Sequence, residues 1–149
     1  MTVKALLELD NSKLVVGRKD TDLLSAVKIM VSKGVNALVV LGNDGKLQGI
    51  VTDHDIIKAL DEHGGNIASV PISKCMTEDV VGCHFEESLM GALDLMGRHH
   101  IRHLVVKESG KVVAVLSIKD VLRRLHEDEK LELSVLKDVV VAARATVSA

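Results

Sequence analysis

Apolar and polar positions alternate along the chain with two periods, one typical of helices and one typical of strands. A short apolar run at residues 14–16 is followed, from Leu23 onward, by apolar side chains three and four positions apart, which predicts an amphipathic helix. Gly34 then provides a C-cap. Apolar runs at 37–41 and 47–51 enclose Asn-Asp-Gly, a strong signal for a β-hairpin. A second helical pattern follows, so the first half of the chain predicts the order β-α-β-β-α.

The second half of the chain repeats this order. A strand at residues 80–82 precedes apolar positions at helical spacing from Leu89 onward. Strands at 103–107 and 112–116 then enclose Glu-Ser-Gly, and another helical pattern follows. Residues 61–79 join the copies and contain the only proline, Pro71. The chain is therefore an internal repeat of one small α+β unit.

Each predicted hairpin runs directly into a motif of the form Ser/Thr-x-x-Asp. GIVTDHDIIKAL places Thr52 and Asp55 where AVLSIKDVLRRL places Ser117 and Asp120. In both copies we expect a helix to begin directly after the hydroxyl residue. A three-stranded sheet with two helices leaves apolar surface bare, and a second copy can cover that surface. This is a structural reason for the duplication, and it requires no ligand.

Composition and charge narrow the class of protein. Of the 149 residues, 47% are hydrophobic, and the chain has Phe85 but no Trp or Tyr, so we expect an aliphatic core. The net charge is −2 and there is no basic stripe, which disfavours nucleic-acid binding. No apolar run approaches the ~20 residues that span a bilayer, and the N-terminal residues show no signal-peptide core. We therefore expect a cytoplasmic protein in which Cys75 and Cys83 are reduced.

The layout closely resembles a tandem pair of cystathionine β-synthase (CBS) domains, known as a Bateman module. The segments that carry the resemblance are GIVTDHDI, AVLSIKDV, GVNALVV, HIRHLVV and KCMTEDVV, and it covers roughly residues 3–126. It implies CBS domains at 3–60 and 80–126, a linker at 61–79 and a helical tail at 127–149. It also implies a pseudo-twofold pair packed sheet to sheet, as in stand-alone bacterial or archaeal CBS-domain proteins.

The resemblance further implies a ligand between the two domains. In this family either of two clefts holds AMP, ADP, ATP, NAD or S-adenosylmethionine, and the motif aspartate accepts hydrogen bonds from the ribose. The chemistry fits, because the first amides of a helix attract anions and an ionised carboxylate accepts strong hydrogen bonds. We therefore expect a non-enzymatic sensor, for example of energy state, that has no catalytic cofactor and signals to an effector protein outside this chain.

The motif also has a purely structural interpretation. Ser/Thr-x-x-Asp is nearly a capping box, in which Thr52 or Ser117 caps a helix and the aspartate lies in its first turn. Either motif alone favours the cap. The duplicated context favours a ligand role for at least one copy, and the two roles are compatible.

Differences between the copies favour the cleft that contains Asp120. The resemblance places basic residues near phosphate and apolar residues of the other domain around adenine. The residues expected to form this cleft are Ser117, Asp120, Arg102, His103, Val15, Val35 and Ala37. The other cleft would combine Thr52 and Asp55 with Val81, Ile101 and His103. It is ranked second because Asn36 and Ala37 stand where cations would help, and it is expected to be empty or to hold a different ligand.

Two further functions and a metal site are weighed against this one. The chain could be a structural dimerisation module with degenerate clefts, or a small enzyme acting on nucleotides, although the sequence contains no recognisable nucleophile–base pair. A cluster of Cys83, His84, His99, His100 and His103 could suggest a metal. Its spacing matches no tight ligand motif, so no metal is expected.

The tail is predicted to be a helix with a short heptad seam. The apolar positions that recur at 3,4,3,4 spacing are Leu133, Leu136, Val140, Ala143 and Val147. The helix would pack on a partner chain or back on its own body. The run Val139-Val140-Val141 forms helices weakly and would depend on such contacts. Together with the bare helix faces of the repeats, this seam predicts a homodimer.

Overall fold

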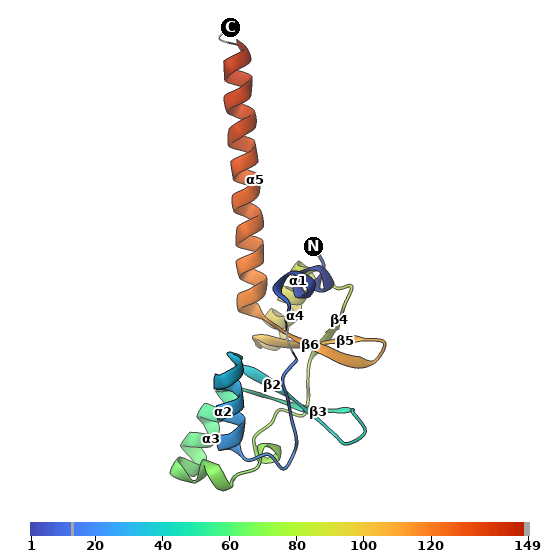
Figure 1. The fold of residues 1–149 in the computed structure, drawn as a ribbon, viewed down its shortest axis with the longest axis vertical. Helices are drawn as coiled ribbons and strands as arrows, with labels where there is room; N and C mark the ends of the chain where they lie inside the picture. Colours follow the sequence, from blue (N-terminus) through green and yellow to red (C-terminus); the bar gives the residue numbers. More distant parts are fainter. Residues whose placement is uncertain (13, 148–149) are drawn as a thin grey trace.

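The computed structural model describes residues 1–12 and 14–147. Within them the chain forms two three-stranded sheets, and a long helix extends far from the globular body (Figure 1). The first copy consists of β1 (Val16–Gly17), α2 (Leu23–Lys33), β2 (Ala37–Leu41), β3 (Leu47–Thr52) and α3 (Asp53–His63). The second copy consists of β4 (Gly82–His84), α4 (Leu89–His99), β5 (His103–Glu108), β6 (Lys111–Ser117) and α5 (Ile118–Val147). The predicted α+β class and the repeated β-α-β-β-α order are confirmed.

The two sheets have the same topology. β1 pairs parallel to β2 and β4 parallel to β5, whereas β2–β3 and β5–β6 are antiparallel hairpins. The short first strands begin two residues later than predicted, at Val16 and Gly82, because few of their residues pair with the neighbouring strand. The second helices begin directly after Thr52 and Ser117, as predicted.

The sheets pack face to face through an aliphatic layer. Ala37, Val39 and Ile50 of the first copy form one buried cluster with Val105 of the second. Val39 and Val105 have no exposed surface. Each sheet thus covers the face that the other would expose to water, and burial of apolar area is the main stabilising term. The sheet-to-sheet packing that the family resemblance implied is confirmed.

The segment before each copy packs on the other copy. An N-terminal helix, α1 (Val3–Asp10), places Val3 and Leu6 in the same buried cluster as Leu104 of the second sheet. The amide of Val3 donates to the carbonyl of Glu87 at 2.8 Å. The sequence analysis assigned no helix here, although Val3, Leu6 and Leu7 have helical spacing.

The linker makes the corresponding contact with the first copy. It contains two 3₁₀ helices, η1 (Gly64–Ser69) and η2 (Ile72–Lys74). Ile72 is fully buried in the core of the first copy, and its amide donates to the carbonyl of Thr21 at 2.8 Å. The two copies are therefore held together by an exchange of their leading segments as well as by their sheets.

Helix α5 packs on the body only in its first part, where Val121 and Leu125 join the core of the second copy. Its 30 residues form one continuous helix, and every side chain from 129 to 147 is exposed. The tail was expected to pack either on a partner chain or back on its own body. Packing on a partner chain is therefore the arrangement that remains to be considered. Among the helices of the described residues, none combines the length and hydropathy required to cross a bilayer.

The exchange of leading segments makes a stability prediction. Leu6→Ala should lower the free energy of unfolding by ~2–5 kcal/mol, because Leu6 is only 1% exposed and truncation leaves a cavity. Leu9→Ala is the matched control in the same helix, because Leu9 is 61% exposed, and it should change stability by less than ~1 kcal/mol. Urea denaturation of both variants measures the difference. Equal stabilities would show that α1 does not hold the second copy.

Candidate functional site

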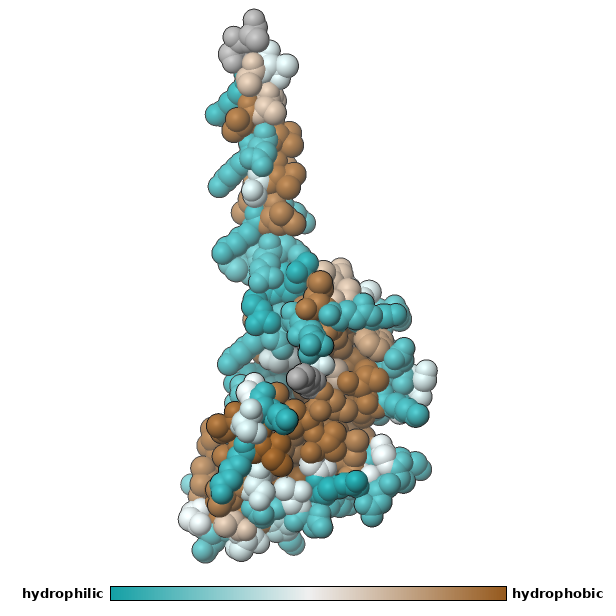
Figure 2. Space-filling view, in the orientation of Figure 1, coloured by the Kyte–Doolittle hydropathy of each residue, from teal (hydrophilic) through white to brown (hydrophobic). Residues whose placement is uncertain are grey.

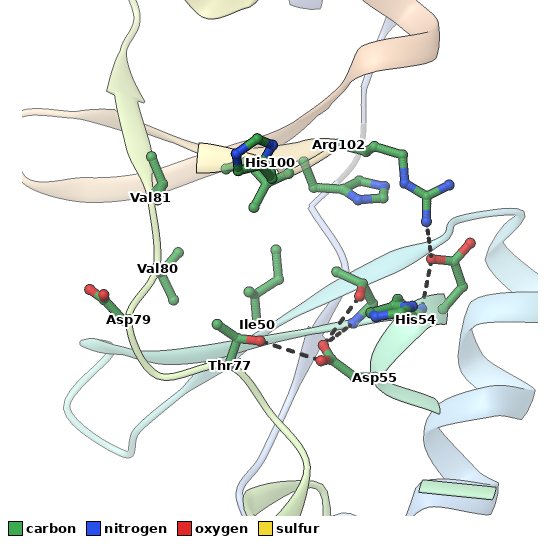
Figure 3. Close-up of a pocket in the computed structure, with 13 residues that line it drawn as sticks. Ile50, His54, Asp55, Thr77, Asp79, Val80, Val81, His100 and Arg102 are labelled. Atoms are coloured by element: carbon green, nitrogen blue, oxygen red, sulfur yellow. Dashed lines mark hydrogen bonds and ion pairs between the residues drawn. The ribbon is translucent and has the colours of Figure 1, made fainter. Parts of the chain in front are cut away.

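Two clefts lie between the copies in the part of the chain that the structure describes. Each contains one of the Ser/Thr-x-x-Asp motifs, and we call them the Asp55 cleft and the Asp120 cleft. Their volumes are about 320 Å³ and about 380 Å³, within the range of small-molecule sites. The Asp55 cleft, drawn in Figure 3, is lined by Ile50, Thr52, Asp53, His54, Asp55, Thr77, Asp79, Val80, Val81, His100, Ile101, Arg102 and His103. The Asp120 cleft is lined by Val15, Gly34, Val35, Asn36, Ala37, His103, Val115, Ser117, Lys119, Asp120 and Arg123.

Asp55 is bound to the start of its own helix. Its Oδ2 accepts a hydrogen bond from the amide of Thr52 at 2.9 Å and lies 3.2 Å from the Thr52 hydroxyl. Its Oδ1 lies 3.4 Å from the hydroxyl of Thr77, which comes from the linker (Figure 3). The first motif therefore forms the capping interaction that the sequence allowed, with the carboxylate at the cleft wall.

Asp120 has a different set of partners. Its Oδ1 accepts from Nη2 of Arg123 at 3.1 Å, and the same nitrogen lies 3.3 Å from Oδ2 of Asp10 in α1. The hydroxyl of Ser117 accepts from the amide of Lys119 at 3.1 Å and so caps the helix. Asp120 is thus held by a flexible, exposed side chain, whereas Asp55 is held by backbone.

The structure brings most of the predicted residues of the Asp120 cleft together. Val15, Val35 and Ala37 of the first copy face Ser117 and Asp120 of the second. His103 also lies there, at the border with the other cleft, because it lines both. Thr52 and Asp55 lie in the Asp55 cleft with Val81, Ile101 and His103, which are the residues expected to accompany them.

Arg102 lies in the other cleft from the one expected. Its Nη2 is 3.7 Å from Oδ1 of Asp53, so it faces the first turn of α3 (Figure 3). The physical reason is in the backbone. The carbonyl of Arg102 accepts from the amide of Ile118, directed at its own helix, while its side chain leaves toward the other copy. Asn36 is the corresponding residue of the first copy. Its backbone carbonyl accepts from the amide of Asp53, and the residue lines the Asp120 cleft. The sequence analysis expected Arg102 in the Asp120 cleft and Asn36 in the Asp55 cleft, whereas each lines the opposite cleft.

The two clefts differ in charge. The Asp55 cleft contains three carboxylates, those of Asp53, Asp55 and Asp79, against the single guanidinium of Arg102. The Asp120 cleft contains one carboxylate against the ammonium of Lys119 and the guanidinium of Arg123. An anion in the Asp120 cleft would therefore meet these two cations instead of Arg102.

The side chain of His103 is partly buried between the clefts. Burial lowers the pKa of its imidazole below the ordinary value, because it desolvates the charged form, and the nearby carboxylate of Asp53 partly opposes this effect. His103 is therefore neutral near pH 7 and can both donate and accept a hydrogen bond.

The sequence analysis missed several residues that line the clefts. Arg123 follows Asp120 by one helical turn, so the spacing was readable in the sequence. Thr77 reaches Asp55 only because the linker pairs with β3 at Ile50, and no local pattern shows that contact. His100 has a left-handed backbone (φ 53°) at the C-cap where the first copy has Gly34 (φ 66°).

Metal-ligating and nucleophilic groups were considered as well. Among the described residues, no three His, Cys, Asp or Glu side chains come close enough together to hold a metal ion. Cys75 and Cys83 are free thiols, and burial raises the pKa of each to about 11. Both thiols are thus protonated and weakly nucleophilic at neutral pH.

The paired repeats and their two interdomain clefts define a tandem-domain module. The family description of the CBS domain matches residues 6–62 and 70–127, and the chain belongs to the CBS-domain family.

Similar proteins include an uncharacterised 17.7 kDa protein of Acidianus ambivalens, 33% identical over 119 residues. That match covers 79% of this chain and 71% of the relative. The CBS domain-containing protein CBSCBSPB1 of Arabidopsis thaliana is 35% identical over 107 residues, which are 72% of this chain but only 20% of the plant protein. The chain thus spans about a fifth of that larger relative.

Solved structures show the same architecture. A CBS-domain protein of Agrobacterium tumefaciens superimposes with a TM-score of 0.78 at 29% identity, over 82% of this chain and 91% of that chain. The CBS domain pair of protein MJ0100, in complex with 5′-methylthioadenosine and S-adenosyl-L-methionine, gives a TM-score of 0.76 at 25% identity, over 86% and 98% of the two chains.

The position of His103 makes stability depend on pH. Because its pKa is lower in the folded protein than in the unfolded chain, protonation favours unfolding. The free energy of unfolding should therefore fall as the pH drops below the unfolded value of ~6.5. His103→Gln should remove this part of the decrease, whereas His99→Gln, at an exposed position, should keep it. Denaturant titrations at pH 7.5 and 5.5 test the prediction, and identical decreases in both variants would contradict it.

Proposed function

We propose that this protein is a non-enzymatic regulatory module that binds an adenosine-containing ligand between its CBS domains and passes the occupancy to a partner protein. The observation that carries the proposal is the construction of the clefts. Each one sets a carboxylate at the start of a helix, where it can accept hydrogen bonds from a ribose, against apolar residues of the other copy. The adenosine ligands of the similar MJ0100 pair support the same class of ligand.

The Asp120 cleft is the proposed site for a phosphorylated ligand such as AMP, ADP, ATP or NAD. Asp120 would accept from the ribose, and Val15, Val35 and Ala37 would contact the adenine. Arg123 and Lys119 would bind phosphate. Arg123 takes the role that the sequence analysis assigned to Arg102.

The Asp55 cleft is the proposed site for a different ligand. Its three carboxylates would repel the negative charges of a ligand's phosphate groups, so a phosphorylated ligand is disfavoured there. A neutral or cationic adenosine derivative fits this charge, since a thioether or a sulfonium adds no negative charge to the nucleoside. The two clefts would then report on two metabolites at once.

Transmission requires that the ligand bind one conformation better than another. In the structure Arg123 connects Asp120 in α5 with Asp10 in α1. A phosphate that recruits Arg123 competes with Asp10 for the guanidinium and so weakens the link between the two helices. Through this change of ion-pair partner, ligand binding in the Asp120 cleft would alter the contact between α1 and α5.

Calorimetric titration with AMP, ADP, ATP, NAD, adenosine and S-adenosylmethionine tests the proposed function. Saturable binding by at least one of them, with no turnover of the bound compound, is expected. Mass spectrometry of the compound released from protein purified under native conditions identifies the physiological ligand. If no compound binds or stabilises the protein, the structural dimerisation module is the better interpretation. Turnover would indicate an enzyme.

Arg123→Ala should weaken AMP binding roughly tenfold to a hundredfold, because a hydrogen bond to a charged group contributes ~1.5–3 kcal/mol. Adenosine should lose much less, since it has no phosphate for the guanidinium to hold. The matched control is Arg102→Ala, in the other cleft, which should leave AMP affinity nearly unchanged. Equal losses for AMP and adenosine in Arg123→Ala would mean that Arg123 supports the fold and not the ligand.

The two aspartates should differ in their effect on the same ligand. Asp120→Ala should weaken AMP binding more than Asp55→Ala, because the cations lie in the Asp120 cleft. Titration of both variants with AMP decides the point. A larger loss in Asp55→Ala would place the nucleotide in the Asp55 cleft.

A further inference from the structure

The last part of helix α5 extends into solvent and adds nothing to the buried core of the described residues. We call residues 129–147 the stem; all of their side chains are exposed, and Figure 1 shows the stem extending away from both sheets. Val139, Val140 and Val141 are poor helix formers, and most helices in proteins are stabilised by packing of an apolar face. A partner surface would therefore stabilise the stem.

Apolar side chains follow one side of the stem. Figure 2 shows an apolar face along the projecting helix with charged residues beside it. Shallow grooves run along this side, lined in part by Leu133, Leu136, Val140, Ala143 and Val147. These five residues occupy the a and d positions of successive heptads, which is the pattern of a two-stranded coiled coil. An aqueous monomer would leave this surface in water.

We propose that the stem pairs in parallel with the stem of a second copy of this chain. The flanking charges select this partner and this direction. With Leu133 at position a, Glu132 occupies position g and Lys137 the following position e. In a parallel pair these positions meet across the interface, so Glu132 faces the partner's Lys137, and the twofold axis makes the pair occur twice.

The antiparallel arrangement is disfavoured by the same residues. An antiparallel pair sets e positions against e positions, and in the stem these are Lys130, Lys137 and Arg144. Every such contact would bring two cations together, which weakens the pair and favours the parallel direction. Because α5 begins at Ile118, two residues before Asp120, a parallel pair also sets the Asp120 clefts of both copies at the same end of the coil.

Sedimentation equilibrium of the full chain tests the pairing, with a dimer as the expected state. Val140→Glu puts a charge into the seam and should raise the dissociation constant at least about a hundredfold. Val135→Glu is the matched control, since Val135 is an exposed valine at position c that lines neither groove, and this change should leave the dimer intact. A monomeric wild-type chain overturns the proposal, and so does a dimer that Val140→Glu leaves unchanged, because it would form through another surface.

Charge exchange and cross-linking test the direction. Glu132→Lys should weaken the dimer roughly tenfold by opposing two lysines, and adding Lys137→Glu should restore it. Ala143→Cys, at a d position, should form a disulfide-linked dimer on mild oxidation, with the unsubstituted chain as the control for Cys75 and Cys83. Failure of the second charge change to restore the dimer, or absence of the cross-link, overturns the parallel direction.

Discussion

The structure depends on one constraint: neither repeat can bury its own sheet. Three strands and two helices leave one face of the sheet uncovered, and the other repeat covers it through Val39 and Val105. The segments that precede the two repeats add to this packing, because α1 lies on the second copy and Ile72 of the linker lies on the first. The clefts are a by-product of this packing, since they open where the ends of the two hairpins meet. A ligand bound there would contact both repeats at once, because residues of both copies line each cleft.

The two clefts share the same repeated backbone but differ in charge. Arg102 stands where the first copy has the neutral Asn36, and each of these residues lines the cleft that contains the motif of the other copy. Arg102 lies among three carboxylates, whereas Asp120 has Lys119 and Arg123 beside it. Pseudo-symmetry in the backbone is thus compatible with two sites of distinct chemistry in one small chain.

The sequence predicted the periodic and local features well. Hairpins, helix starts and the left-handed Gly34 follow from residue patterns only a few positions long, and the repeat doubled each signal. The sequence analysis was wrong where a side chain can point into either of two clefts and no local pattern decides between them. The direction of Arg102 depends on the backbone hydrogen bond to Ile118, and the contact of Thr77 with Asp55 depends on a linker path. Helix α1 was missed because its apolar residues pack on a sheet distant in sequence.

Helix α5 joins the chemistry of a cleft to a point far from it. It begins at Ile118, carries Asp120 and Arg123 in its first two turns and has 30 unbroken residues, a length of ~45 Å at ~1.5 Å per residue. A rigid rod of that length acts as a lever arm with its fulcrum at the cleft. A tilt of only ~5° at its base would move its far end by ~4 Å, as much as the width of a side chain. The amplitude of a rearrangement around Asp120 is therefore greatest where the stem ends.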